Sequence, residues 1–347
     1  MATTVHLRER LPSYRSQTRI APARAAKIRD LSMKAWLKGV TVAGLVAGAG
    51  LTLLGLLTRW WPPLDIVNNG LLFVTAGAIA LLCLALAARD WRLVLVAAVL
   101  AAVNVMLVIA ALPGTAADAA PGSPRFLRVV TFNLWHYNDR IDDVAKFLAE
   151  TDADAMVLQE VGKPNGALLR QALQSRYPYT VGDWGIIILS KHPILADGRI
   201  DRPGYPPWIS LMVRWVRIEV NGTPLDLAGV HLTRPFYAEL QQQDIAALIA
   251  FANSRTLPLV MAGDFNMSPW TEKLGRFERS SGLKRYNTFH LTWPMARGTL
   301  PLLPLVAIDN VFASPQFARI AVAPGPRLGS DHRPIVADLA LQPGADE

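Results

Sequence analysis

The first third of the chain is dominated by long stretches that lack charged side chains. Residues 39–58, 66–88 and 93–113 contain no Asp, Glu, Lys or Arg. A helix of about 20 apolar residues crosses the roughly 30 Å hydrocarbon core of a bilayer, so each stretch predicts a membrane-spanning helix. The alternative is a cleaved signal peptide followed by buried core helices. A leader of 38 residues and three apolar stretches in succession argue against it.

Short apolar segments replace the long stretches in the rest of the chain. Apolar, β-branched runs predict strands at 127–132, 155–158, 185–189, 208–220, 224–230, 257–262, 306–312 and 334–341. Apolar residues at helical spacing predict helices at 141–148 and 236–252, and Asn221-Gly222 predicts a hairpin turn. We therefore predict one mixed α/β domain at 127–347, preceded by a linker rich in Pro, Gly and Ala at 114–126.

The formal net charge of +8 belongs entirely to the membrane region. Residues 1–114 hold 12 Lys and Arg against 4 Asp and Glu, whereas residues 115–347 hold 23 of each kind. Basic segments stay in the cytoplasm during insertion, so the leader at 1–38 is expected inside. Three crossings at 39–113 then place the α/β domain outside the cytoplasm. Its balanced charge shows no surplus of the kind that a DNA-binding groove requires.

Polar residues suited to phosphate chemistry stand at the ends of the predicted strands. They lie in five segments: Thr-Phe-Asn at 131–133, Leu-Gln-Glu at 158–160, Val-His-Leu at 230–232, Gly-Asp-Phe-Asn at 263–266 and Gly-Ser-Asp-His-Arg-Pro at 329–334. Hydrolysis of a phosphate ester needs a cation, an activated water and hydrogen-bond donors for the developing charge. Glu160 is the natural first ligand for Mg²⁺, and the amide oxygen of Asn133 could join it. Taken singly, such residues also fit charged strand ends or turn caps.

The ordered set of five segments resembles the endonuclease/exonuclease/phosphatase superfamily over nearly all of residues 127–341. The resemblance implies an α/β fold of two stacked mixed β-sheets flanked by helices, a four-layer sandwich, here preceded by three transmembrane α-helices. It implies a phosphoric ester hydrolase that depends on Mg²⁺ or Mn²⁺. It extends to bacterial members with three N-terminal spans, so we expect a multi-pass protein of the cell membrane with a periplasmic or extracellular catalytic domain.

The resemblance also assigns the metal and water-activating residues. It implies that Asn133, Glu160 and Asp331 hold the metal ion. It gives Asp264 the task of orienting or deprotonating the attacking water and Asn266 that of donating to the phosphoryl oxygens. Because residues two apart at a strand end point the same way, the last two side chains are expected to face one spot.

Two histidines complete the implied site. By resemblance, His231 donates to a phosphoryl oxygen and His332 contacts the scissile phosphate. Asp309 matches the carboxylate that pairs with this second histidine, which would raise the pKa of the imidazole. One position departs from the DNA-repair members, because Trp135 stands where they often carry Asp. His136, His192 and His290 match none of the segments, and we assign them no role, although His136 stands only three residues beyond Asn133 and could lie on the rim of the site.

Three functions are compatible with these observations. The preferred one is a phosphohydrolase that meets its phosphate-ester substrate at the lipid bilayer, where a phospholipid head group or a lipid-linked pyrophosphate is within reach. The alternative is an extracytoplasmic nuclease, for which Lys284, Arg285 and Tyr286 form the only obvious nucleic-acid-binding cluster. A receptor that merely binds a phosphorylated ligand would not require a water-activating Asp264. The sequence does not define an oligomeric state.

Overall fold

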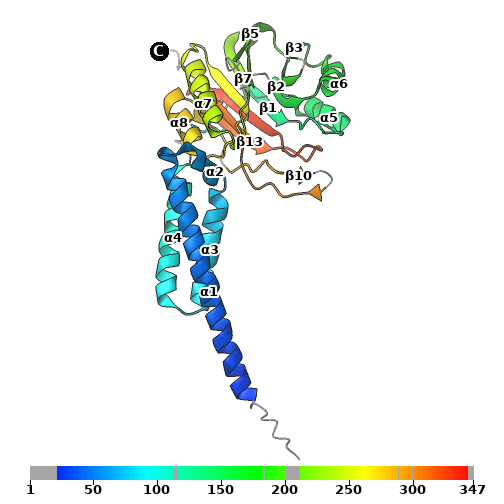
Figure 1. Cartoon of the computed structure of the whole chain (residues 1–347). Coiled ribbons are helices and arrows are strands. Elements are labelled where there is room, and N and C mark those ends of the chain that lie inside the picture. The colour runs from blue at the N-terminus through cyan, green and yellow to red at the C-terminus, as the bar shows by residue number, and fades with distance from the viewer. Residues whose placement is uncertain are drawn as a thin grey trace, which may run out of the picture.

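The computed structural model describes residues 22–112, 116–182, 184–200, 212–287, 289–297 and 300–342. Figure 1 shows a bundle of helices that stands against one side of an α/β domain. The bundle contains α1 (Pro22–Leu56), α3 (Leu71–Ala87) and α4 (Trp91–Ala110). The connection from α1 to α3 contains η1 (Leu57–Arg59), η2 (Pro62–Leu64) and α2 (Asp65–Asn68).

The helices of the bundle are candidate membrane spans. In the described residues, Ser32–Arg59 and Trp91–Ala110 are long and apolar enough to cross a membrane. A third crossing is added if Pro62–Asn68 and Leu71–Ala87, which meet at a bend of 57°, count as one span. Thr52 of α1 and Asn104 of α4 are buried and joined by a 2.9 Å bond from the amide to the hydroxyl. Such a pair satisfies polar groups that lipid cannot.

Two six-stranded mixed sheets form the α/β domain. The first has the order β13-β14-β1-β2-β4-β3, and the second has the order β5-β6-β7-β8-β12-β9. The first sheet contains β1 (Leu127–Asn133), β2 (Ala155–Val161), β3 (Tyr179–Val181), β4 (Gly185–Ser190), β13 (Phe317–Pro324) and β14 (Ile335–Leu341). The second contains β5 (Ile194–Ile200), β6 (Met212–Val220), β7 (Thr223–His231), β8 (Leu259–Asp264), β9 (Lys284–Arg285) and β12 (Asp309–Ala313). A small hairpin, β10 (Ala296–Arg297) with β11 (Leu300–Pro301), lies outside both sheets.

The side chains of the strands alternate between two kinds of core. Val129, Val157 and Leu227 belong to the cluster between the sheets, whereas Val130 faces the helices α5 (Ile141–Thr151) and α6 (Lys163–Leu173) on the outer face of the first sheet. The helices α7 (Ala238–Asn253) and α8 (Glu272–Ser281) cover the outer face of the second sheet. The result is the four-layer sandwich that was predicted, with helices on both outer faces (Figure 1).

Residues 116–124 of the predicted linker are attached to the α/β domain. The backbone N–H of Arg319 donates to the carbonyl of Ala117, and its guanidinium donates to Asp118 at 2.7 Å. The predicted strand at 208–220 is observed as Met212–Val220, and residues 208–211 lie outside the described residues.

Candidate active site

The second sheet places three of the predicted site residues in one row. β7, β8 and β12 are neighbours, and their register sets His231 beside Asp264 and Asp264 beside Asp309. Gly263 allows β8 to approach β7 this closely, because a Cβ atom at this position would collide with the carbonyl oxygen of Val230. The row is therefore a consequence of strand order and of one glycine.

The first sheet contributes Asn133 and Glu160 from the ends of the parallel strands β1 and β2. The amide nitrogen of Asn133 donates to Asp264 at 3.0 Å and to Glu160 at 3.3 Å. Its oxygen accepts the N–H of Trp135 at 3.0 Å. In this arrangement the nitrogen faces the carboxylates. Coordination of a metal through the carbonyl oxygen would require the amide to turn and to release Trp135.

The loop before β14 brings in His332. Ser330 donates through its hydroxyl to the carbonyl of Asn133 at 2.7 Å and accepts the N–H of His332 at 2.9 Å. Gly329 has φ +82°, and a Cβ atom there would also collide with Asn138. The Gly-Ser-Asp-His sequence thus makes a turn that ties the last loop of the chain to the first strand of the domain.

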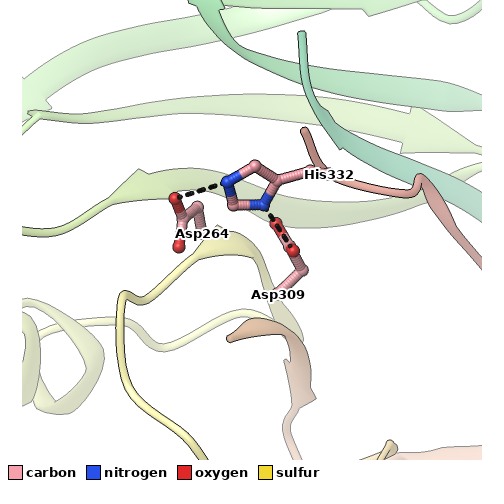
Figure 2. Close-up of side chains that lie close together, drawn as sticks. All are labelled: Asp264, Asp309 and His332. Carbon is pink, nitrogen blue, oxygen red and sulfur yellow. Dashed lines mark hydrogen bonds and ion pairs between the residues drawn. The ribbon is translucent and has the colours of Figure 1, made fainter. Parts of the chain in front are cut away.

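His332 lies between two carboxylates, one at each ring nitrogen (Figure 2). Nδ1 is 2.8 Å from Asp309 Oδ2, and Nε2 is 3.8 Å from Asp264 Oδ2. Burial alone would lower the pKa of His332, but the charges of Asp309 and Asp264 outweigh it and raise the pKa to about 10. Burial, aided by Asp309, raises the pKa of Asp264 to about 6. Near pH 8 the geometry therefore holds an imidazolium beside an ionised Asp264.

Asp264, Asp309 and His332 are also close enough together to hold a metal ion, because one potential ligand atom of each lies within 4.8 Å of the others. The hydrogen bonding favours a different role for this group. A histidine that is protonated at both nitrogens has no free lone pair for a metal, so binding there would require the loss of a proton that both carboxylates stabilise. The geometry therefore fits a hydrogen-bonded catalytic triad better than a metal site.

Glu160 lies near the His231 end of the row, with three nitrogen-bearing side chains around it. His231 Nε2 is 3.6 Å from Oε1, His136 Nδ1 is 3.3 Å from Oε2, and Arg234 lies at 3.9 Å. Burial would raise the pKa of Glu160, but His231 and the hydrogen bonds from Asn133 and His136 lower it overall. Glu160 is therefore a carboxylate that stays ionised at neutral pH.

Asp331 supplies a further carboxylate to the same pocket. Its Oδ2 accepts a hydrogen bond from the indole of Trp293 at 3.2 Å. Burial raises the pKa of Asp331, and the negative charge of Glu160 adds to this effect. Two carboxylates, one of which destabilises the ionised form of the other, fit a hard divalent cation, whose charge would relieve that repulsion.

Asn266 is placed by the turn that follows β8. Its backbone N–H donates to Asp264 Oδ1 at 2.8 Å, and its side-chain amide donates to the carbonyl of Leu232 at 2.9 Å. Asn266, Glu160 and Trp135 all have left-handed backbones, with φ of +50°, +52° and +55°. Three such residues around one pocket are a concentration of backbone strain that is typical of functional sites.

A pocket of about 650 Å³ opens over these groups. Five of the predicted site residues line it: Glu160, Asp264, Asn266, Asp331 and His332. Apolar residues form much of the remaining lining: Ile66, Trp135, Tyr137, Pro235, Phe236, Trp293, Val306 and Ile308. His136, three residues beyond Asn133, lines the pocket, as its spacing suggested. Sequence reasoning missed Arg234 and Trp293 at this site. Arg234 lies three residues beyond the predicted site residue His231, and this spacing was the only available signal.

His192 and His290 lie elsewhere, as the motifs led us to expect. His192 Nε2 is 3.1 Å from Asp154, and His290 is hydrogen-bonded to the carbonyl of Val322. Seven predicted residues are instead joined by the contacts described above: Asn133, Glu160, His231, Asp264, Asn266, Asp309 and His332. Asp331 joins them because its Oδ1 lies 4.0 Å from His332 Nε2.

Two stacked mixed sheets, with an acidic and histidine-containing pocket at the strand ends, define an α/β-sandwich hydrolase. The chain belongs to the endonuclease/exonuclease/phosphatase family, whose model matches residues 130–332, more than half of the chain. Members of this family are phosphoesterases and nucleases. Curated proteins give no match to the chain.

Solved structures share the fold at low sequence identity. A family protein from Bacteroides thetaiotaomicron is 16% identical with a TM-score of 0.55, and the match covers 64% of this chain and 97% of that one. A mannosyl-6-phosphatase from the same species is 17% identical with a TM-score of 0.52, covering 62% and 100%. A humanized TDP2 from D. rerio is 15% identical with a TM-score of 0.52, covering 61% and 98%.

Proposed function

We propose that the chain is a membrane-anchored, divalent-metal-dependent phosphohydrolase that acts outside the cytoplasm. The observation that carries the proposal is the triad of Asp264, His332 and Asp309, which lies close to two further carboxylates, Glu160 and Asp331. A binding protein would need positive charge for a phosphate, but it would not need a buried carboxylate with a pKa of about 6. A carboxylate of that kind is suited to accept a proton from water near neutral pH.

Each group has a distinct task in this proposal. Asp264 orients the attacking water and accepts its proton. Hydrogen bonds from Asn133 and Asn266 hold the carboxylate of Asp264 in place for this task. The imidazolium of His332 donates a hydrogen bond to the phosphoryl group, and Asp309 keeps that imidazole charged. His231 and the amide of Asn266 are further donors. Catalysis then depends on donors that are already fixed before the substrate binds.

Glu160 and Asp331 are the residues that we propose to hold Mg²⁺ or Mn²⁺. Asn133, whose amide nitrogen faces Glu160, is the third residue of the set expected from the sequence and would join through its carbonyl oxygen only after turning. Such a cation, when bound, neutralises charge on the transferred phosphoryl group. The hard oxygen donors fit both of these ions.

Glu160→Gln is expected to raise the metal concentration needed for half-maximal activity by about tenfold or more, since even outer residues of metal sites have effects of this size. Gln retains an oxygen that can accept the amide of Asn133, so the loss is one of charge. Thermal stabilisation of the protein by Mg²⁺ should fall in parallel, which gives a readout besides activity. Glu219→Gln, an exposed position on β6, is the control. An unchanged metal dependence would remove Glu160 from the metal site.

The apolar wall of the pocket favours a substrate with a hydrocarbon portion. A phosphate alone would gain nothing from Ile66, Phe236 and Ile308, whereas a lipid-linked phosphate or pyrophosphate would bury apolar surface there. The solved structure named as a mannosyl-6-phosphatase lends support to phosphate-ester chemistry on this fold. The two or three apolar helices support an anchor that would hold the site near the bilayer.

The nuclease alternative loses its clearest supporting feature. Arg285 and Tyr286 are buried, and Arg285 lies 2.9 Å from Glu278. Neither side chain is available to bind a nucleic acid. Of the three residues in the predicted cluster, Lys284 is therefore the one that remains exposed. Nucleic acid remains the competing substrate in the experiment below.

The decisive experiment is a substrate panel with the detergent-purified full-length protein and Mg²⁺. Polyprenyl pyrophosphate, phospholipids and plasmid DNA are incubated side by side, with EDTA and Asp264→Asn as controls. We expect metal-dependent release of phosphate or head group from a lipid and intact DNA. Degraded DNA with unchanged lipids would instead identify a nuclease that uses the membrane only for its location. No turnover of any substrate by folded protein would favour the receptor.

A further inference from the structure

The connection between the first two helices of the bundle is fastened to the α/β domain. Asp65 is 2% exposed, and its carboxylate accepts the backbone N–H groups of Glu272 at 2.9 Å and Lys273 at 3.1 Å. These N–H groups belong to the first two residues of α8 and therefore have no hydrogen-bond acceptor inside that helix. Thr271, the helix's own N-cap residue, makes no capping bond through its side chain. A carboxylate from the membrane region therefore caps a helix of the catalytic domain.

A second attachment lies in the turn after β8, close to the predicted site residue Asn266. Asn69 accepts the backbone N–H of Ser268 at 2.7 Å, and the hydroxyl of Ser268 donates to the carbonyl of Asn68 at 3.2 Å. Ser268 is only two residues beyond Asn266 in the chain. The segment that runs from the end of β8 to the start of α8 is thus attached to the connection at its middle, through Ser268, and at its α8 end.

These attachments place the connection in the wall of the active-site pocket. Ile66 and Asn69 line the same pocket as Asp264 and His332, and Ile66 retains 36% of its surface exposed. In Figure 1, α2 lies where the bundle meets the α/β domain. Because α1 ends and α3 begins next to this connection, a bundle inserted in a membrane would hold Ile66 at the bilayer surface.

We infer that the connection at residues 62–70 is a substrate-positioning element, in which Ile66 contacts the hydrocarbon chain of a lipid-linked phosphate whose head group lies at Asp264 and His332. The inference deepens the proposed function and rests on its lipid substrate. Its physical basis is the placement of one apolar side chain between the bilayer surface and the catalytic groups. A water-soluble phosphate ester would reach the same catalytic groups without touching Ile66.

The test compares two substrates on the full-length protein in lipid nanodiscs. One is a long-chain polyprenyl pyrophosphate in the bilayer, and the other is a water-soluble nitrophenyl phosphate mono- or diester. Ile66→Ser is expected to raise KM for the lipid by about tenfold, as the loss of apolar contact in a binding pocket commonly does, with kcat nearly unchanged. Both constants for the soluble ester should stay within about twofold. Ile66→Leu should restore the KM for the lipid.

Ile320→Ser on β13 is the matched control, since Ile320 is 39% exposed and does not line the pocket. If Ile66→Ser lowers kcat/KM equally for both substrates, Ile66 only supports the fold. If it raises kcat/KM equally for both, Ile66 obstructs the site. Either result would overturn the inference. Native-like kinetics with the lipid would also overturn the inference while leaving the proposed function intact. If the native protein hydrolyses only the soluble ester, the lipid substrate and the inference fail together.

Discussion

Replacement of Asp264 by asparagine is expected to lower turnover by a factor of about 10² to 10⁴, which is the usual contribution of a positioned general base. Asparagine has nearly the same shape, and its oxygen can still accept the N–H of Asn266. It cannot take a proton from water. It also removes one of the two negative charges that hold His332 in its charged form. The chemical step should therefore fail even though the pocket remains.

The cost to the fold should be small compared with the loss of rate. The new amide nitrogen would face the amide nitrogen of Asn133, which now donates to Asp264 at 3.0 Å, so one hydrogen bond is lost. A buried donor left without its partner costs about 1–3 kcal/mol, which a thermal unfolding measurement will detect.

Asp226→Asn provides the matched control for the loss of a buried carboxylate. Asp226 is fully buried, pairs with Arg217 at 2.8 Å and stands five residues before His231 on β7, roughly 16 Å away along the strand. It should lower stability and leave the turnover of folded protein unchanged. Activity that survives in Asp264→Asn would show that another group activates the water.

The elements that were predicted from the sequence are those that carry a strong apolar pattern. The strands beginning at Leu127, Ala155 and Leu259 are buried on both faces, and each ends at a site residue or one residue beyond it. β5 and β13 were missed because they are edge strands in which intermediate and exposed residues predominate. α8 was missed because it is polar apart from Leu274 and Phe277, which are buried against its sheet.

The resemblance predicted that eight residues would lie together, and it predicted their mutual geometry only in part. The resemblance supplied the eight residues and their expected roles, and the contacts among them appear only in the fold. Local patterns could not reveal that the amide of Asn133 faces the carboxylates, since this depends on the N–H of Trp135. Nor could they reveal that Asp65 caps a helix more than 200 residues away, because short-range spacing carries no information about such contacts.

The pH dependence of kcat/KM should show a broad plateau bounded by Asp264 and His332. The proposed mechanism requires Asp264 ionised, and because its pKa is raised to about 6, the rate should fall as the pH drops through about 6. The proposed mechanism also requires His332 protonated, and because its pKa is raised to about 10, the rate should fall as the pH rises through about 10. The two limbs therefore belong to a base and an acid that stabilise each other's charged forms.

Asp309→Asn is expected to narrow this plateau from its alkaline side. Asparagine can still accept the hydrogen bond of His332 Nδ1, but it lacks the charge that raises the pKa of the imidazole. A unit charge at about 4 Å, at the effective dielectric constant of about 20 that suits proteins, contributes roughly 4 kcal/mol, so the alkaline limb should move down by about three pH units. The acidic limb should also move down, since Asp309 contributes to the raised pKa of Asp264.

Profiles of kcat/KM from pH 5 to above pH 10, at saturating Mg²⁺, measure both limbs in the native protein and in Asp309→Asn. Asp226→Asn serves again as the control and should leave both limbs in place. An alkaline limb that stays at the native position in Asp309→Asn would show that His332 does not act as the cationic donor. The Asp309–His332 pair would then be structural, and Arg234, which lies 3.9 Å from Glu160, would be the next candidate for a cationic side chain at the phosphoryl group.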